Sequence, residues 1–556
     1  MIPNTGQIVR GWSRPFCIGV FLLSLIATAY TLTAVVLLCG GAVGGWIYPS
    51  AILLSALIVC GIDRDKHALL DIASALGIVA LVSVICTFME DASWDGNVYH
   101  QKVVALLLYG WNPYHPTKIW DIYYDPWVWH YAKSLEMSAA SVAAATGYIE
   151  SGKSVNFILI LSSAFLVYDF LCRSGVRLSV KCRLWLTVIA VANPVGMAQS
   201  ITYYNDFAKY YYLLITIISA VSICRSDRNR RTVWYGILFA VIILAIGTKF
   251  TAFFEEGVAV AVFMLWLMWH KDWRLLRTIF VIAVAALVSG ALLLGYHPYV
   301  TNCLMAGHPL YPLLGDGAID IMTGLTPEIF REHGRVYNFL SSLLTPRVPY
   351  YAEFAGGFGA LMPLLLAIVA AVAIFMWRKV PMAIYSIGGF VLASCFFYEQ
   401  SWWARYICQL WLLVPIAVFA TCYSRSRWSK YARSGIIVCV VLTMAGVGFR
   451  AAKGSATLSV RRQMLYEFTR DDGARVANLT LECRRHFEER GISVQEVGVD
   501  SLSETSLIFF GDKSPWVYPM VDVTQGQYAE FAKRCRIFGM HPERHLSKDF
   551  HFVDLQ

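Results

Sequence analysis

The sequence predicts an all-α polytopic membrane protein with a small α/β domain at its C-terminal end. Of the 556 residues, 57% are hydrophobic and only 15% are charged, whereas soluble domains carry about 25% charged residues. The chain also contains many apolar stretches of about 20 residues, the length that crosses a bilayer as a helix. The net charge of +9 arises from no single basic tract, so nucleic acid is not an expected partner.

We expect about thirteen transmembrane helices. They lie near 16–40, 42–61, 68–88, 154–172, 184–202, 207–224, 232–248, 252–269, 276–295, 357–377, 381–398, 402–422 and 433–449. The first stretch is too long for a cleavable signal peptide and lacks a small-residue cleavage site, so it is expected to be a span.

Alternate loops between these spans are rich in lysine and arginine, and by the positive-inside rule they face the cytoplasm. This places the N-terminus in the cytoplasm, and an odd number of spans places the C-terminal region outside. We therefore expect a transmembrane domain over 1–449, with outer loops 89–152 and 296–356, and an extracytoplasmic domain over 450–556. Within the first outer loop, residues 128–145 are expected to form an amphipathic helix lying on the membrane.

Three carboxylates follow the third apolar stretch, Glu90, Asp91 and Asp95, with Tyr99 and His100 close behind. Acidic side chains at a span end either face water or line a polar site. Partial desolvation raises the pKa of a carboxylate and suits it to act as a general base, the role expected for Asp95. The alternative is that the three acids cap the next helix.

Three further segments on the same expected face carry unusual polar residues. Asn205 and Asp206 can bind a sugar, an acceptor or a cation, unless Asp206 only pairs with Lys209. Lys249 ends a nearly charge-free span and needs an anion, either a phosphate or a nearby glutamate, Glu255 or Glu256. Arg405 lies among aromatic residues beside Tyr406 and can hold a phosphate through two hydrogen bonds, or it pairs with Glu399.

No metal site is expected. The chain has no CxxC or Cys/His spacing typical of zinc, and His100, His115 and His130 form no helical HxxxH pair.

Several short segments together resemble the GT-C integral-membrane glycosyltransferases, especially bacterial polyprenyl-phosphate-dependent mannosyl- and aminoarabinosyl-type transferases. They are Asp95–His100, Gly110–Tyr114, Tyr204–Asp206, Gly247–Ala252, His308–Pro312 and Arg405–Tyr406. The resemblance implies transfer of a sugar from a polyprenyl-phosphate carrier to a lipid, glycan or protein acceptor at the outer face of a bacterial inner membrane.

By this resemblance, Asp95 and Asp206 are catalytic, with Asp95 the base of an inverting reaction. The residues implied to bind substrate are Glu90, Asp91, Tyr99, His100, Asn205, Lys249, His308, Tyr311, Arg405 and Tyr406. No cofactor is required; a divalent cation held by Asp95 and Asp206 is the alternative.

Two other classes of function stay open from the sequence. A transporter or lipid-linked-sugar flippase would also carry polar residues in its spans, although usually at mid-span and in repeated units. A glycan polymerase or ligase with a lipid-diphosphate donor would share the arginines of the outer face. A purely structural role remains the simplest alternative.

Overall fold

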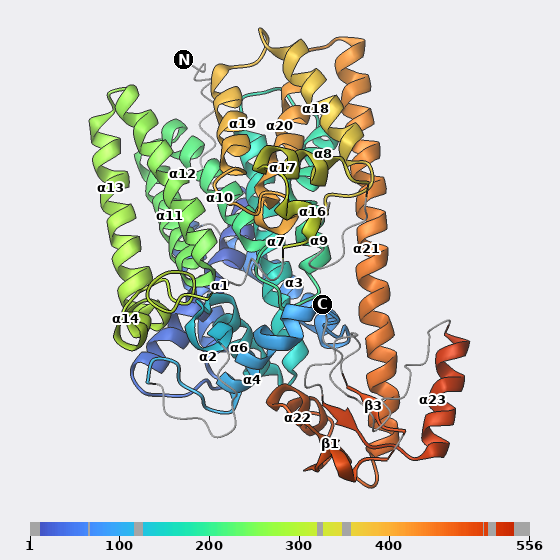
Figure 1. Cartoon of the computed structure of the whole chain (residues 1–556). Helices are drawn as coiled ribbons and strands as arrows, with labels where there is room; N and C mark the ends of the chain where they lie inside the picture. The colour runs from blue at the N-terminus through green and yellow to red at the C-terminus, as the bar shows by residue number, and fades with distance from the viewer. Residues whose placement is uncertain are drawn as a thin grey trace.

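In a computed structural model, the chain is described over residues 12–64, 67–115, 126–319, 326–346, 357–503, 505–509 and 519–538. It is a helical bundle with a small sheet at one end (Figure 1). Within the described residues, seven helices are long and apolar enough to cross a membrane, and four shorter helices are also apolar.

The long apolar helices begin with α1 and end with α21, which forms one side of the bundle (Figure 1). They are α1 (Arg14–Leu38), α3 (Ala68–Thr87), α7 (Ser154–Arg173), α11 (Arg228–Thr248), α12 (Phe250–Trp269), α13 (Trp273–Leu287) and α21 (Arg427–Thr469). The span of α7 begins at Ile149 with a 3-10 turn, and that of α13 continues to Leu293 as a π-helical segment. The shorter apolar helices are α2 (Ile47–Ile62), α18 (Met362–Met376), α19 (Met382–Ser394) and α20 (Leu413–Thr421), the last preceded by the 3-10 segment η6 (Cys408–Leu412). The helix α10 (Ala208–Arg225) is buried along most of its length.

Shorter elements connect the long helices. They are η1 (Gly96–His100), α4 (Gln101–Leu108), α5 (Pro126–His130), α6 (Ser134–Thr146), η2 (Ile149–Lys153), α8 (Val180–Val191), α9 (Pro194–Gln199), η3 (Val288–Leu293), η4 (Tyr296–Val300), α14 (Thr301–Ala306), α16 (Glu328–Arg331), α17 (Arg335–Leu344) and η5 (Ala404–Tyr406).

Two stretches expected as single spans are interrupted. The stretch 184–202 is two helices, α8 and α9, because Pro194 has no backbone N–H to continue α8 and the side chain of Asn193 caps α9 by accepting from the backbone N–H of Val195. In the stretch 402–422 only the second half is α-helical. Its first half contains the 3-10 segments η5 and η6, and η5 carries Arg405.

The prediction of an amphipathic helix on the membrane surface over 128–145 is wrong. The corresponding helix α6 is covered by protein, with every residue from Ser134 to Ala143 buried. Its small residues explain this placement, because serine and alanine allow close packing of helices. The side chain of Ser138 bonds back to its own helix and to the carbonyl of Ile26 in α1.

The last span continues far beyond its expected end at residue 449. Helix α21 has 43 residues and is about 65 Å long at 1.5 Å per residue, roughly twice the thickness of a bilayer core. Its C-terminal end packs through Met464, Leu465 and Tyr466 into a second hydrophobic core.

That core lies against a four-stranded sheet of order β2-β1-β4-β3. The strands are β1 (Ala474–Ala477), β2 (Val494–Glu496), β3 (Leu507–Ile508) and β4 (Met520–Val521), and the helices beside them are α22 (Leu481–Glu488) and α23 (Gln525–Ile537). Strand β1 pairs parallel with β2 and antiparallel with β4, which pairs antiparallel with β3. The sequences around β2 and β3, ISVQEVGV over 492–499 and SLIFF over 506–510, are rich in the residues typical of strands.

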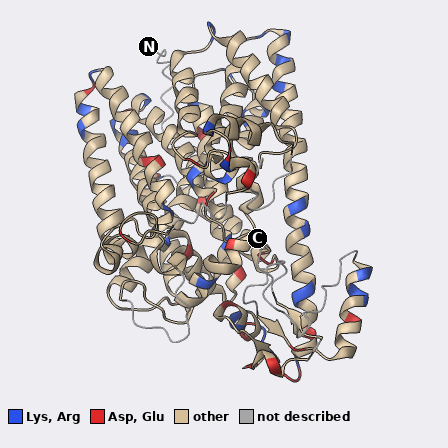
Figure 2. Ribbon diagram, in the orientation of Figure 1, with Lys and Arg blue, Asp and Glu red and all other residues tan. Residues whose placement is uncertain are grey.

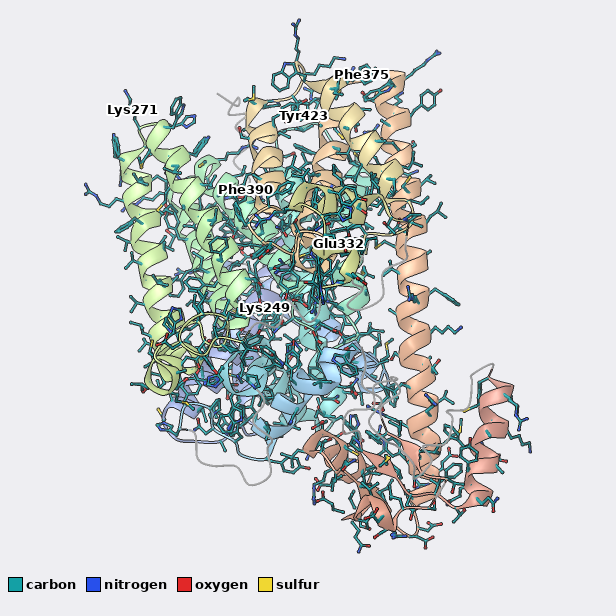
Figure 3. The ribbon with its side chains drawn as sticks, in the orientation of Figure 1. Lys249, Lys271, Glu332, Phe375, Phe390 and Tyr423 are labelled. Atoms are coloured by element: carbon teal, nitrogen blue, oxygen red, sulfur yellow. The ribbon has the colours of Figure 1, made fainter. Side chains whose placement is uncertain are left out.

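The sheet and the start of α13 lie at opposite ends of the molecule (Figure 1). Lysine and arginine residues lie along the end where α13 begins, and others lie in the C-terminal region together with acidic residues (Figure 2). Lys271 and Tyr423 lie at that end, whereas Lys249 lies deep between the two ends (Figure 3).

Candidate functional site

Four charged residues from distant segments meet at one place. Arg405 Nη1 donates to Asp95 Oδ2 at 2.6 Å and lies 3.4 Å from Asp206 Oδ2. Lys249 Nζ donates to the other oxygen of Asp206. The structure thus joins both expected catalytic carboxylates to both expected phosphate ligands.

These contacts differ from the simpler pairings considered from the sequence. Lys249 pairs with Asp206 instead of a glutamate of its own segment, and Arg405 pairs with the two aspartates instead of Glu399. Lys209 pairs with Glu255, at 3.0 Å, instead of Asp206.

Each charged side chain lies where a regular helix begins, ends or is interrupted. Asp95 precedes η1, and Asp206 precedes α10 by two residues. Lys249 separates α11 from α12 with an extended backbone (φ −163°, ψ 144°). Such breaks bring polar side chains into the bundle, and the protein surroundings satisfy the freed backbone groups.

Aromatic rings surround the charged group. The guanidinium of Arg405 lies 3.9 Å from the ring centre of Trp403, and rings of Tyr204 and Tyr406 lie at 5.7 Å. The Tyr99 hydroxyl donates to Asp95 Oδ2 at 3.3 Å, and the Asp95 backbone N–H donates to the Tyr204 hydroxyl at 3.3 Å. These rings exclude water and thereby strengthen the electrostatic contacts between them.

The charged side chains are not equally accessible. Asp95 is 16% exposed, Lys249 15% and Arg405 10%, whereas Asp206 is only 4% exposed. A ligand can therefore reach Asp95 and the two cations more readily than Asp206. Arg405 also has an unused donor, since its buried Nε has no hydrogen-bond partner among the described residues. A buried N–H without a partner is costly, so this donor favours the binding of a ligand that supplies an acceptor oxygen.

Asp206 is the anion that the two cations share. Burial alone would raise its pKa, but Lys249 and Arg405 outweigh burial and hold the pKa of Asp206 well below its usual range. Asp206 is therefore ionised at neutral pH. It acts as a poor proton acceptor while both cations remain in place.

A second ion pair, not expected from the sequence, supports the site from inside the bundle. Lys209 and Glu255 are both nearly fully buried. The Lys209 ammonium also donates to the backbone carbonyl of Tyr406 and lies 4.8 Å from the ring centre of Tyr398. This pair therefore fixes the backbone next to Arg405.

The expected residues His100 and Asn205 are joined by Glu136, which the sequence did not single out. Glu136 Oε1 lies 2.6 Å from His100 Nδ1 and accepts from Asn205 Nδ2 at 3.3 Å. Asn205 Nδ2 also lies 3.4 Å from the carbonyl oxygen of Thr248, the residue before Lys249. The feature of the sequence that could have identified Glu136 is that it is an acid in a helix made mostly of small and apolar residues, α6.

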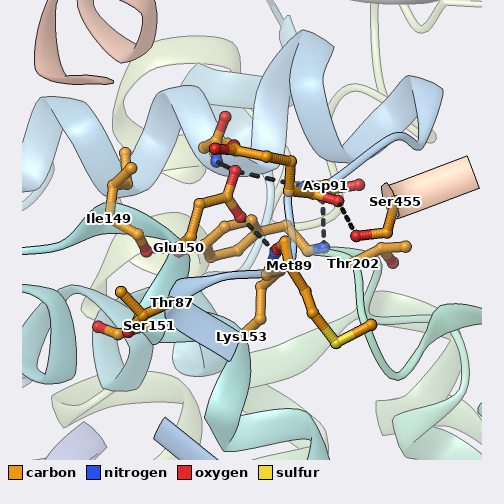
Figure 4. A network of polar contacts seen from close by, with 12 residues as sticks. Thr87, Met89, Asp91, Ile149, Glu150, Ser151, Lys153, Thr202 and Ser455 are labelled. Atoms are coloured by element: carbon orange, nitrogen blue, oxygen red, sulfur yellow. Dashed lines mark hydrogen bonds and ion pairs between the residues drawn. The ribbon is translucent and has the colours of Figure 1, made fainter. Parts of the chain in front are cut away.

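Glu90 and Asp91 lie in a different, fully buried network. Asp91 accepts from the backbone N–H of Tyr203 at 2.6 Å and from the backbone and hydroxyl of Ser93. Glu150, Lys153 and the backbone of Met89 meet beside it (Figure 4). The contacts of these two acids are thus with the protein itself.

His308 and Tyr311 make their contacts elsewhere. His308 Nδ1 accepts from the backbone N–H of Leu310 at 3.1 Å. The carbonyl of Tyr311 accepts from Asn302, and its ring lies 4.7 Å from that of His130. None of these contacts reaches Asp95, Asp206, Lys249 or Arg405.

Within the described part of the chain, two groups of side chains have the spacing of metal ligands. They are Cys17, Asp63 and Asp71, and Glu90, Glu150 and His486. An arginine already contacts an acid in each group: Arg14 contacts Asp71, and Arg462 contacts Glu90 and Glu150. Asp95 and Asp206 belong to neither group, and the charge between them is that of Arg405.

The chain matches no protein-family model and no curated protein. Among solved structures it is similar to the crystal structure of ArnT from Cupriavidus metallidurans bound to undecaprenyl phosphate. The two chains are 12% identical, with a TM-score of 0.42, and the similarity covers 84% of this chain and 88% of that one.

Proposed function

We propose that this protein is a membrane glycosyltransferase that moves a sugar from a polyprenyl-phosphate carrier to an acceptor. The supporting observation is that Arg405 contacts both Asp95 and Asp206, and that Lys249 contacts Asp206. This charged group is partly exposed and is surrounded by aromatic rings. Two cations suit the phosphate of a lipid monophosphate, and an accessible carboxylate suits the activation of a hydroxyl or amine.

The first proposed step is an exchange of partners. Arg405 contacts Asp95 at 2.6 Å and neutralises its charge. A donor phosphate competes with the carboxylate for this guanidinium, whose Nε has a free donor for an additional oxygen. The exchange leaves the Asp95 carboxylate free to accept a hydrogen bond, and then a proton, from the acceptor.

In the chemical step, Asp95 takes the proton of the acceptor hydroxyl or amine. The acceptor atom forms a bond to the anomeric carbon from the face opposite the phosphate, so the configuration inverts. The bond between the anomeric carbon and the phosphate oxygen breaks, and the polyprenyl phosphate leaves with that electron pair. Arg405 and Lys249 stabilise the additional negative charge. The two side chains supply the positive charge that this step needs.

In this proposal Asp206 is catalytic through the cations that it orients. Because it contacts both, its removal separates Arg405 from Lys249. In the same proposal, Tyr99, Tyr406, Asn205 and His100 bind or position the substrate.

The proposed domains are a transmembrane domain over 1–449 and a C-terminal domain over 450–556, with the reaction at the outer face of a bacterial inner membrane. The end of the bundle away from the sheet carries basic residues with few acidic ones, which supports a cytoplasmic N-terminus (Figure 2).

The test uses the purified full chain, a panel of radiolabelled polyprenyl-phosphate sugars and a membrane extract as the source of acceptor. We expect label to enter a new glycosidic product with the wild type and with Asp316→Asn, an exposed carboxylate in loop 296–356. Asp95→Asn should yield no product above background. Transport of label across sealed vesicles without a new glycosidic bond would refute the proposal.

A further inference from the structure

The loop that carries Asp95 is held at one end by helix α21. Arg462 donates to the carboxylate of Glu90, and its side chain is fully buried. Two serines of the same helix bond the backbone of Glu90: Ser455 Oγ donates to its carbonyl at 2.7 Å, and its N–H donates to Ser459 Oγ at 3.2 Å. Figure 4 shows Ser455 beside Asp91, the next residue of the loop.

The same arginine reaches the other side of Asp95. Arg462 Nη2 lies 3.4 Å from Asn97 Oδ1. Asn97 Nδ2 in turn donates to the carbonyls of Asp91 and Ser93, at 2.8 and 2.7 Å. The loop from Glu90 to Asn97 is thus folded on itself around one guanidinium, with Asp95 inside the closed segment.

A second contact of α21 reaches Asp95 through an aromatic ring. Ala451 packs with Tyr204 in a small hydrophobic cluster. The Tyr204 hydroxyl accepts from the Asp95 backbone N–H at 3.3 Å. The backbone of the expected base is therefore positioned by a ring that α21 covers.

Helix α22 completes the attachment. Arg490, just beyond it, lies 3.3 Å from Glu90 Oε1 and packs 4.0 Å from the ring centre of Tyr466. Glu488 accepts from Tyr109 at the end of α4 at 2.5 Å, and Glu489 accepts from the backbone N–H of Ile149 at 2.7 Å. The helix that follows Asp95 is therefore also fixed by the C-terminal region.

We infer that the C-terminal region is part of the transferase machinery, with Arg462 and Arg490 acting as positioning residues that set the location of Asp95 through Glu90. This inference rests on the proposed function for its kinetic consequence. The contacts given above join both arginines to the loop that carries Asp95, so we expect their effect to be on the base more than on the phosphate ligands. A misplacement of about 1 Å can cost about 100-fold in rate.

Arg490 is the residue to change, since its side chain is 26% exposed and Arg462 keeps Glu90 partnered. We expect Arg490→Gln to lower kcat about 10-fold and to leave KM for the polyprenyl-phosphate sugar within about 2-fold. Arg490→Lys, which can still pair with Glu90, should recover most of kcat. The matched control is Arg475→Gln. It removes the ion pair between Arg475, in β1 of the C-terminal sheet, and Asp522, and it should behave as wild type.

Hydrogen exchange supplies a measurement that is independent of turnover. In Arg490→Gln the amides of residues 91–97 should exchange at least about 5-fold faster than in wild type and in Arg475→Gln, because local opening becomes easier. Wild-type kcat together with wild-type exchange in Arg490→Gln would overturn the inference. A fall in kcat that Arg490→Lys does not recover, or an equal fall in Arg475→Gln, would also overturn it.

Failure of the proposed function has a different signature. If the wild type transfers no sugar, yet exchange at 91–97 accelerates only in Arg490→Gln, the attachment of the loop stands and the transferase reaction is wrong. If the Arg462→Lys variant folds, the same measurements on it provide a second test. Its expected effect is larger, because a buried pair loses more than a partly exposed one.

Discussion

Arg405 Nη1 lies 2.6 Å from Asp95 Oδ2, although 310 positions separate the two residues along the chain. The same guanidinium contacts Asp206, which also binds Lys249. Each carboxylate therefore contacts a cation, and an anionic ligand of these cations must compete with a carboxylate. Because of this competition, a substitution of Asp95 should increase the affinity for the polyprenyl-phosphate donor, whereas a substitution of Arg405 should decrease it.

Asp95→Asn should greatly lower kcat while it strengthens donor binding. The amide cannot accept the acceptor's proton, so kcat should fall between about 100-fold and about 10,000-fold, the usual contribution of a general base. The same change frees Arg405 from a competing anion, so the affinity for polyprenyl phosphate should increase a few-fold. Equilibrium binding of radiolabelled polyprenyl phosphate measures this. Weaker binding by Asp95→Asn would contradict the exchange of partners.

Arg405→Lys should mainly raise KM for the donor. A lysine keeps the charge but loses the planar set of donors and the stacking on Trp403, whose ring centre lies 3.9 Å from the guanidinium. We expect KM to increase by about 10-fold to 100-fold, as for the loss of one charge-assisted hydrogen bond. Arg335→Lys is the control, because this exposed arginine donates to a backbone carbonyl, that of Phe396, at 3.0 Å. A KM equal to wild type in Arg405→Lys would remove Arg405 from the donor site.

The sequence was sufficient to identify the members of the central group. Lys249 and Arg405 each stand in an apolar segment where a charge needs a partner, and Asp95 and Asp206 each lie at a span end. Burial in an apolar bundle makes such charges conspicuous. Their partners could not be derived, because pairing depends on which helix ends meet, and apolar spans carry little information about their neighbours.

Glu136 and Arg462 show the limits of reading each segment alone. Glu136 was part of a stretch that reads equally well as a surface helix, and only the packing of α6 between other helices places the acid beside His100. Arg462 stands in an ordinary charged sequence. Its complete burial results from the length of α21 and from the sheet that covers its end, neither of which local composition specifies.

The stability of the protein should fall as the pH rises toward 8, with a contribution from Glu90. Burial raises the pKa of Glu90 to about 7, against the opposing effect of Arg462. For an acid with a raised folded-state pKa, the stabilising contribution is complete below its unfolded value of about 4.5 and is lost as the pH rises through about 7. Glu90→Gln cannot ionise and should lose this part of the pH dependence.

Thermal unfolding of the detergent-solubilised protein between pH 5.5 and 8 measures the effect. We expect the difference between wild type and Glu90→Gln to change by an amount on the order of 1 to 3 kcal/mol across this range, in the direction that favours the variant at high pH. Glu332→Gln serves as control, because this residue is exposed. Parallel pH curves for wild type and Glu90→Gln would contradict the shift.

Gly247→Ala should destabilise the protein because no room exists for a methyl group. A Cβ at this position would lie 2.6 Å from the Tyr30 hydroxyl and 2.9 Å from the Cβ of Ser134. Gly247 thus permits the close approach of α11 to α1 and α6, two residues before Lys249. Overpacking at a buried position costs about 1 to 3 kcal/mol. Gly236→Ala, in the same helix with nothing within 4 Å of the added atom, should be neutral or stabilising by up to about 1 kcal/mol. Equal melting temperatures for the two variants would show that α1, α6 and α11 are not closely packed at Gly247. The position of Lys249 would then not depend on this contact.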